Sequence, residues 1–231
     1  MPAERDTSAV DLLTGWAAAL QRLTGGDDPE GRDSAHARLG LGLIARYTES
    51  HRRYHNLAHV AAVLSTVAEL VGCADEPDVV RLAAWYHDAV YDPRSTDNEE
   101  HSAVLAAAEL AEAGVPPAAV CRVAELIRCT AGHDAPPGDR DAEVLCDADL
   151  RVLAAAAPDY DRYTAAVRAE YAHVADGDWR AGRAAVLHGL LSLPRLFRTA
   201  PARAWEPVAR ANLRRELAAL SGPSGGAARP P

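Results

Sequence analysis

The chain has 231 residues, and 48% of them are hydrophobic, so it can bury a full-sized core that we expect to form one domain. Its net charge of −9 argues against a nucleic-acid polymer as a partner, because surfaces that bind such polymers need basic patches to neutralise phosphates. All 24 basic residues are arginine, and the absence of lysine excludes Schiff-base chemistry and a Walker-type phosphate loop.

The sequence predicts neither a membrane span nor an export signal. No apolar run approaches the roughly 20 residues that a bilayer-spanning helix needs. The stretch that begins at Met1 lacks the basic start and the apolar segment of a signal peptide. The four cysteines form no Cys-x-x-Cys pair, which is typical of small buried residues in a reducing compartment. We therefore expect a cytoplasmic protein without a membrane partner.

The hydrophobic pattern predicts an all-α fold. Apolar residues recur at steps of three and four residues, and no long stretch alternates with a period of two. The expected helices span residues 8–24, 31–49, 56–72, 77–91, 97–113, 117–131, 141–156, 159–175, 179–192 and 203–220.

Turn-forming residues support these boundaries. Asp97 and Glu100 have the spacing of a capping box at a helix start, and Gly114 is placed to end that helix. The Gly- and Pro-rich stretch at 221–231 is expected to be disordered. We therefore predict a short tail at 1–7, a single helical domain at 8–220 and a disordered tail at 221–231.

The first residues that can carry chemistry are His55 and His59. They are four positions apart and would share a helical face, whose column continues through Val63, Val67 and Leu70. His59 is therefore expected to point toward the core. This segment alone favours a buried histidine that is satisfied by a backbone carbonyl over a metal ligand.

The second segment contains His87 and Asp88. His87 continues an apolar column that includes Val80 and Ala83, so it also points inward. A buried carboxylate without a partner is costly, and a metal ion would remove that cost for Asp88. The alternative is that Asp88 lies at the solvent edge of the helix.

The third segment offers two aspartates. Asp149 shares its helical column with Leu145 and Val152 and is expected to face inward as a ligand. Asp147 shares its column with Glu143, so we expect a solvated or capping side chain there.

Together these segments direct four candidate metal ligands toward the core: His59, His87, Asp88 and Asp149. Two imidazoles and two carboxylates form a mixed nitrogen and oxygen set that suits a divalent ion, namely Mn, Fe, Co, Ni, Zn or Mg. A metal ion in such a set polarises a phosphoryl oxygen and lowers the pKa of water. We therefore interpret Asp88 as part of the catalytic centre as well as a ligand.

The order of these residues resembles the HD superfamily of helical metal-dependent phosphohydrolases. More narrowly, the chain resembles the bacterial predicted metal-dependent HD phosphohydrolases, in which R-x-Y-H-N-L-x-H, H-D-x-V-Y-D, N-E-x-x-S-A and D-A-D-L follow one another. The matching stretches here are RRYHNLAH at 52–59, HDAVYD at 87–92, NEEHSA at 98–103 and DADL at 147–150. Looser matches extend the resemblance over about residues 8–220. It implies a single-domain helical bundle of the HD type.

A second, partial resemblance concerns the mechanism. Residues 54–59 are similar to the Y-H-N-x-x-H motif of cyclic-nucleotide phosphodiesterases, in which the first histidine protonates the leaving oxygen and the second binds metal. The resemblance implies that His55 is the general acid, a role that suits an imidazole. Those enzymes have another histidine three residues after the His-Asp pair, where this chain has Tyr91, so a two-metal cyclic-nucleotide site is not implied.

Further residues are candidates for contact with the substrate: Arg52, Asn56, Glu99 and His133. Arg52, like Arg151 and Arg183, offers a guanidinium group that can fork onto phosphate oxygens. His133 follows Gly132 in a predicted loop, where it completes a second metal site, contacts substrate or lies on the surface. Glu99 would orient water or substrate unless it is solvated.

These residues predict an enzyme that hydrolyses a phosphoester of a small phosphorylated metabolite, for example a nucleotide, with metal-activated water. Two alternatives remain open at this point. An HD-type di-iron oxygenase would need about six protein ligands, and a non-catalytic metal-binding HD module would need no proton donor such as His55.

Overall fold

The protein is helical throughout the part that the computed structural model describes, residues 9–25 and 32–221. This confirms the predicted all-α class. Within these residues the α-helices are α1 (Ala9–Thr24), α2 (Arg32–Tyr47), α3 (Leu57–Glu69), α4 (Pro77–Tyr86), α5 (Asn98–Glu112), α6 (Pro117–Thr130), α7 (Arg140–Asp149), α8 (Ala157–Glu170), α9 (Asp176–Ser192) and α10 (Glu206–Ser221). Three short 3-10 helices are η1 (Val71–Cys73), η2 (Leu150–Ala154) and η3 (Ala202–Trp205). None of the described helices is long and apolar enough to cross a membrane.

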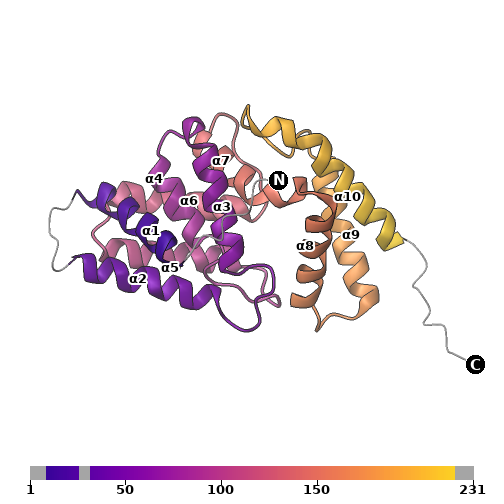
Figure 1. Ribbon diagram of the computed structural model, residues 1–231, viewed down its shortest axis with the longest axis horizontal. Helices are drawn as coiled ribbons and strands as arrows, with labels where there is room; N and C mark the ends of the chain where they lie inside the picture. The colour runs from indigo at the N-terminus through magenta and orange to yellow at the C-terminus, as the bar shows by residue number, and fades with distance from the viewer. Residues whose placement is uncertain (1–8, 26–31, 222–231) are drawn as a thin grey trace, which may run out of the picture.

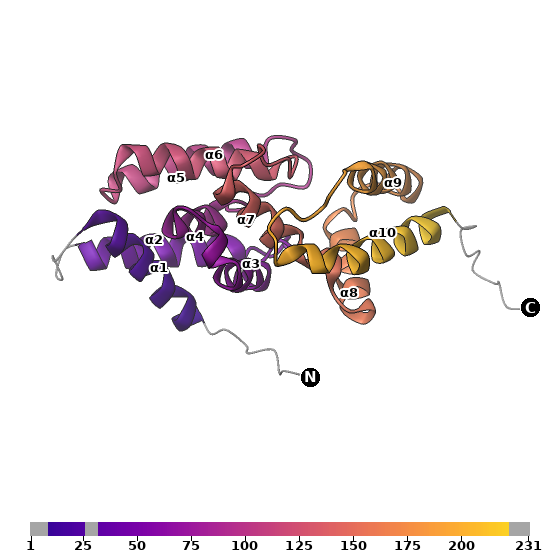
Figure 2. The same ribbon diagram turned by 90° about the horizontal axis from the view of Figure 1, so that it is seen from above.

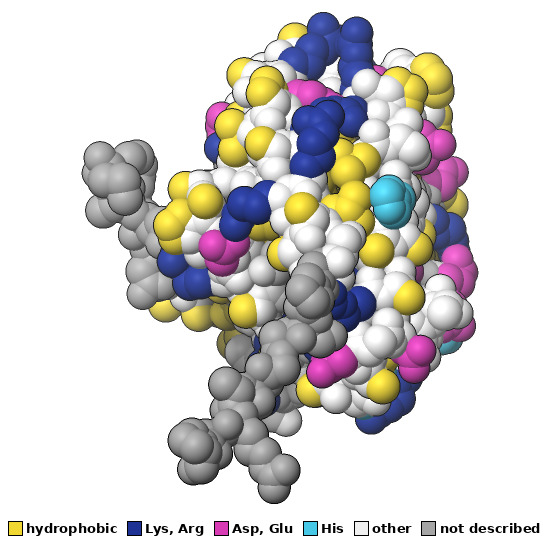
Figure 3. All heavy atoms as spheres, turned by 90° about the vertical axis from the view of Figure 1, so that its right-hand side faces the viewer, with side chains coloured by type: hydrophobic (Ala, Val, Ile, Leu, Met, Phe, Trp, Pro, Cys, Tyr) yellow, Lys and Arg dark blue, Asp and Glu magenta, His cyan; other side chains and the backbone are white. Residues whose placement is uncertain are grey.

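The helices form a larger group, α1–α7, and a smaller group, α8–α10, at its side (Figures 1 and 2). In the larger group α5 and α6 lie against each other, α4 packs on α1 and α6, and α3 packs on α4 and α7. The short helix η2 follows α7 directly and contacts both α8 and α10. The chain therefore passes from the centre of the larger group straight into the smaller one. Figure 3 shows that the face at the α8–α10 end mixes arginine, acidic and apolar side chains.

Aromatic side chains join α1, α2 and α4 at the core. The indole of Trp16 is fully buried, meets that of Trp85 edge-on with ring centroids 5.6 Å apart, and donates a hydrogen bond to the carbonyl of His36 at 2.7 Å. Gly40 allows this contact, because a Cβ at this position would lie 2.7 Å from Cδ1 of the Trp16 ring. Close approach of α1 and α2 thus depends on a residue without a side chain.

The helix boundaries follow the sequence prediction with a few informative differences. Gly114 ends α5 in the left-handed region with φ 81°, as predicted, and the N–H of Val115 returns to the carbonyl of Leu110 at 3.0 Å. The predicted capping box does not form, because the carboxylate of Asp97 contacts the Ser95 hydroxyl instead of the backbone of α5. The predicted tails at 1–7 and 221–231 lie outside the described residues, apart from Ser221, the last residue of α10.

The prediction that Asp147 is solvated is wrong. Its side chain is completely buried, and its two carboxylate oxygens accept the backbone N–H groups of Arg198 and Thr199, each at 2.8 Å. Helical phase alone placed Asp147 on a polar face, but the segment between α9 and η3 covers that face. The carboxylate therefore connects α7 to the C-terminal group of helices.

We predict that Asp147→Ala lowers the stability of the protein by about 1–3 kcal/mol, because two buried N–H groups lose their acceptor. Urea unfolding of the purified variant measures this. Asp147→Asn is the matched control, since its amide oxygen still accepts one of the two bonds, and its loss should be smaller. A variant with alanine that unfolds at the wild-type urea concentration would contradict the buried role.

Candidate metal centre

Four chain segments converge at one point beside α3. The first turn of α3 carries His59, and the tight turn after α4 carries His87 and Asp88. Asp149 is the last residue of α7, and His133 lies in the loop after α6. α4 ends at Tyr86, five residues earlier than predicted, and its last turn aims His87 at α3. The four predicted ligands are therefore brought together by ends of helices.

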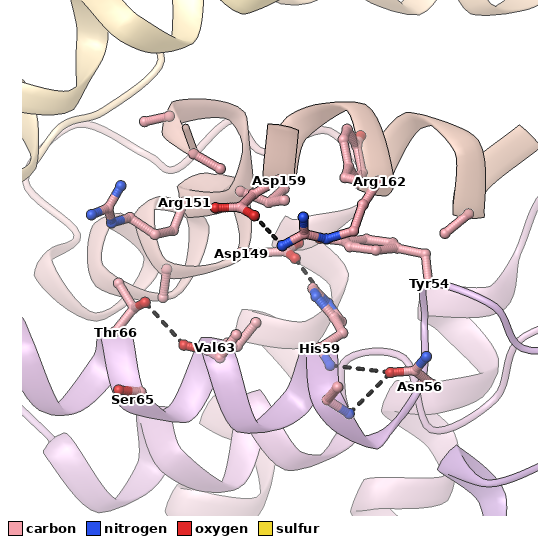
Figure 4. A pocket seen from close by; sticks show the side chains of 18 of the residues that line it. Tyr54, Asn56, His59, Val63, Ser65, Thr66, Asp149, Arg151, Asp159 and Arg162 are labelled. Carbon is pink, nitrogen blue, oxygen red and sulfur yellow. Dashed lines mark hydrogen bonds and ion pairs between the residues drawn. The ribbon is translucent and has the colours of Figure 1, made fainter. Parts of the chain in front are cut away.

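The ligand atoms are close enough to share one ion. Nε2 of His59 is 3.0 Å from Nε2 of His87 and 3.3 Å from both Oδ2 of Asp88 and Oδ1 of Asp149. Nε2 of His87 is 3.0 Å from Oδ2 of Asp88 and 3.6 Å from Oδ1 of Asp149. Figure 4 shows the contact between His59 and Asp149. His59, His87 and Asp149 can therefore hold a metal ion together, and Asp88 adjoins them.

The hydrogen bonding of His87 fits metal binding. Its Nδ1 lies 2.9 Å from the carbonyl of Ala84, which can only accept, so Nδ1 carries the proton. In the neutral ring Nε2 then has a free lone pair, and it points at Nε2 of His59. Two nitrogen atoms at 3.0 Å with two carboxylates beside them need a proton or a cation between them. This donor set fits a divalent metal ion.

Electrostatics keep both carboxylates ionised. Burial by itself would raise the pKa of Asp88, but the positive charge of His87, when its ring is protonated, holds the pKa well below its usual range. A metal ion would replace this positive charge when the rings are neutral. The pKa of Asp149 is also well below its usual range, because hydrogen bonds from His133, His59 and His87 outweigh the effect of burial. A pair of carboxylates that stays charged in a buried place attracts a cation.

His133 contacts the cluster, which removes one of the three alternatives that the sequence left open for it, the unconnected surface histidine. Its Nε2 lies 2.7 Å from Oδ2 of Asp149, so it is not an unconnected surface histidine. Its backbone has φ 50°, in the left-handed region that non-glycine residues seldom adopt, and this turn directs the ring at Asp149. His133 orients Asp149 or adds a donor beside it.

His55 stands next to the cluster and is held by a residue that sequence reasoning missed. Its Nδ1 lies 2.7 Å from Oε2 of Glu170, and its ring stacks on that of Tyr91 with centroids 4.2 Å apart. The ring is 5.8 Å from that of His59, centroid to centroid. The side chain of His55 is 23% exposed, so a substrate can reach it. A proton on Nδ1 shared with Glu170 leaves Nε2 as the edge that can exchange protons.

Glu170 is the missed residue. Its Oε1 accepts the backbone N–H groups of Arg53, Tyr54 and His55 at 2.7, 2.8 and 2.9 Å, and its Oε2 also accepts the hydroxyl of Tyr91 at 2.9 Å. Burial would raise the pKa of Glu170, but His55 and the backbone N–H groups lower it to about 2. The sequence pattern that could have indicated Glu170 lies in α8, where it follows the buried Tyr160 and Val167 on one face of the helix.

Three predicted contacts with the substrate are not supported. Arg52 is wrong as a substrate ligand, because its side chain is 0% exposed and donates to the carbonyls of His55, Asp88 and Ala89. It holds the turn that carries Asp88 instead.

Asn56 lies beside the cluster, whereas Glu99 is absent from the wall of the cavity there. The amide of Asn56 caps α3, because its Oδ1 accepts the N–H groups of Ala58 and His59 at 3.0 and 3.3 Å. It lines the cavity beside the cluster, but its amide is already engaged. Glu99 lies in the first turn of α5, where its charge adds to the effect of burial in raising the pKa of Tyr171.

The other two arginines that were predicted as phosphate ligands, Arg183 and Arg151, lie in different surroundings. Arg183 is buried and forms a two-pronged ion pair with Glu216, so it is structural. Arg151 lines a cavity of about 800 Å³ in whose wall His59 and Asp149 also lie. Arg53 and Arg162 line the same cavity and were not singled out from the sequence.

Comparison of the chain with protein-family models, with curated proteins and with solved structures finds no match.

We predict that Asp149→Ala and Asp88→Ala abolish bound metal. Because metal that binds only native protein stabilises it by mass action, a chelator should lower the melting temperature of the wild type and leave that of the variants unchanged. Metal analysis of purified protein and thermal unfolding with and without chelator measure the two effects. Asp92→Ala is the control, since that carboxylate caps a turn at Arg94 outside the cluster. Stoichiometric metal in Asp149→Ala would show that the ligands are assigned wrongly.

We predict that Glu170→Gln is less stable than the wild type at neutral pH and that the difference disappears in acid. The pKa of Glu170 is about 2 in the folded protein and 4.5 ordinarily, so the stability that its charge contributes is present above pH 4.5 and is lost as the pH falls toward 2. Unfolding midpoints of both proteins at several pH values measure the difference. A difference that stays constant from neutral pH to about pH 3 would contradict the assignment, because it would have another origin than the charge.

Proposed function

We propose that the protein is a metal-dependent phosphohydrolase of the HD type, which cleaves a phosphoester of a small phosphorylated metabolite, a nucleotide among the candidates. The observation that carries the proposal is the convergence of His59, His87 and Asp149 within reach of one ion, with Asp88 beside them and His55 held nearby by Glu170. The donor set and the resemblance of the motifs to the HD superfamily support the same class.

His59, His87, Asp88 and Asp149 would hold the metal, which supplies a Lewis acid for a phosphoryl oxygen and lowers the pKa of water. The residues of the chain do the rest. Ionised Asp88 and Asp149 provide the negative charge that retains a cation, and His133 orients Asp149 through its Nε2. His55 donates a proton to the leaving oxygen, and Glu170 keeps its ring in place with the proton on Nδ1.

The surroundings support a small substrate. The cavity of about 800 Å³ is of the size that holds a metabolite, and arginines from three segments line it. All four cysteines are free thiols, of which Cys129 and Cys146 lie 3.8 Å apart, sulfur to sulfur. The scattered spacing of the four cysteines in the sequence supports the proposed cytoplasmic location.

The test of this proposal is a turnover screen of metal-loaded protein against nucleotides, sugar phosphates, pyrophosphates and nitrophenyl phosphates, with wild type and His55→Ala side by side. We expect turnover that depends on added Mn²⁺, Ni²⁺, Co²⁺ or Mg²⁺ and stops with chelator. His55→Ala should lose about 10²–10⁴ in turnover on esters with a poor leaving group and less on nitrophenyl phosphates, which need little protonation.

Two results would contradict the proposal. Metal binding without turnover on any of these phosphoesters would favour a non-catalytic metal-binding module, and bound iron with consumption of oxygen would favour an oxygenase. Equal losses of His55→Ala on good and poor leaving groups would remove His55 from proton transfer. Metal content of His55→Ala serves as the control, because the variant should retain the ion.

A further inference from the structure

The cavity beside the cluster is elongated along α3. Its wall runs from Asn56 and His59 at one end to Thr66 and Glu69 at the other, with η2 and the first half of α8 opposite. Figure 4 shows His59 and Asp149 toward one side of the cavity and Thr66 with Arg151 toward the other. Seven positions along a helix separate His59 from Thr66, which corresponds to about 10 Å. A ligand that fills the cavity therefore reaches well beyond the ion-binding end.

Arg151 supplies a positive charge at the distant end. Its guanidinium lies over the ring of Trp205, 4.1 Å from the centroid, and within the described residues it forms neither an ion pair nor a side-chain hydrogen bond. Stacking on an aromatic face keeps a guanidinium flat and leaves the N–H groups at its edge free to donate. Such an arginine is a prepared ligand for a carboxylate or a phosphate.

Arg162 on α8 adds a second charge above the cavity. It pairs with Asp159, and the two side chains are 69% and 44% exposed. An ion pair this exposed is weak, so an anionic group of a ligand can replace Asp159 at little cost. Outside the cluster the charged residues of the wall are three arginines and two acids, Arg53, Arg151 and Arg162 against Glu69 and Asp159. This local excess of positive charge stands in a chain whose net charge is −9.

The part of the wall between the two ends is mainly apolar. Val63, Val152 and a row of alanines line it, with the rings of Tyr54 and Tyr163 alongside. The apolar part of the wall lies between the candidate metal centre and Arg151, each of which can bind an anionic group. This order favours a ligand in which a ring or a carbon chain joins two anionic groups.

We propose that the substrate carries a second anionic group about 10 Å from the phosphate that is cleaved, and that Arg151 binds this group. The proposal rests on the proposed function for the phosphate at the cluster. It names the substrate class as an elongated phosphorylated metabolite with a carboxylate or a further phosphate at its distant end. Arg151 is then a residue that determines specificity and does not touch the reacting atoms.

The test uses ligands that cannot be hydrolysed, namely alkane-α,ω-bisphosphonates of increasing length and alkyl monophosphonates of matched length, bound to the Mn²⁺-loaded full chain. Calorimetry measures each affinity. We expect the bisphosphonate whose phosphorus atoms lie about 10 Å apart to bind roughly tenfold more tightly than its monophosphonate, the usual worth of one charge-assisted pair. Arg151→Gln should remove that tenfold difference.

Three further variants complete the test. Asp159→Asn releases Arg162, which Figure 4 shows on the side of Asp149, and should tighten the binding of bisphosphonate and monophosphonate alike, whereas Arg162→Gln should weaken the binding of both. Arg128→Gln is the matched control, because this arginine pairs with Glu100 outside the cavity, and it should keep the wild-type difference.

A wild type that binds both ligands equally, or a tenfold difference that survives in Arg151→Gln, would overturn the inference and leave the proposed function intact. Loss of binding for both ligands would overturn the inference and the proposed function together. Since no turnover is needed, a protein that hydrolyses nothing can still support the site of the second anionic group.

Discussion

Two imidazole nitrogens 3.0 Å apart, with the ionised oxygens of Asp88 and Asp149 beside them, form the contact on which the rest of the structure depends. A buried arrangement of this kind persists only if each member is oriented by something else. The carbonyl of Ala84 orients His87, the N-cap of Asn56 starts the helix of His59, and His133 holds Asp149. Several helix ends therefore meet in one place. The tight turn after α4 positions His87 and Asp88 there, and the loop after α6 positions His133.

Glu170 brings the C-terminal helices into the same centre. One carboxylate oxygen accepts three consecutive backbone N–H groups from the segment that precedes α3, and the other meets His55 and Tyr91. Asp147 makes a second link of the same type, from α7 to the segment after α9. In both cases a buried carboxylate bonds backbone donors far away in the sequence, which fixes the position of one group of helices against the other.

Local periodicity was enough to predict the helices and the inward direction of His59, His87 and Asp149, because His59 and Asp149 lie in apolar columns of their own helices and His87 continues the column of α4 into the turn that follows it. It failed where the burial comes from elsewhere in the chain. Asp147 looked solvated because its cover, around Arg198, is distant in sequence. Arg52 looked free because the carbonyls of Asp88 and Ala89 that it binds belong to another turn. Glu170 was not predicted as a site residue because its partners, the backbone of Arg53 to His55 and the side chains of His55 and Tyr91, lie far away in the sequence.

The link through Glu170 also determines how much of the chain the candidate site requires. A fragment that ends after η2 would retain the four candidate ligands, His59, His87, Asp88 and Asp149. It would lack Glu170, which accepts the backbone N–H groups of the segment from Arg53 to His55. Such a fragment would keep the candidate metal ligands and lose the contact that orients His55, the residue that we propose as the proton donor. The helices α8–α10 are therefore part of the candidate site, because α8 supplies Glu170. A shortened chain without them would lack the residue that positions His55.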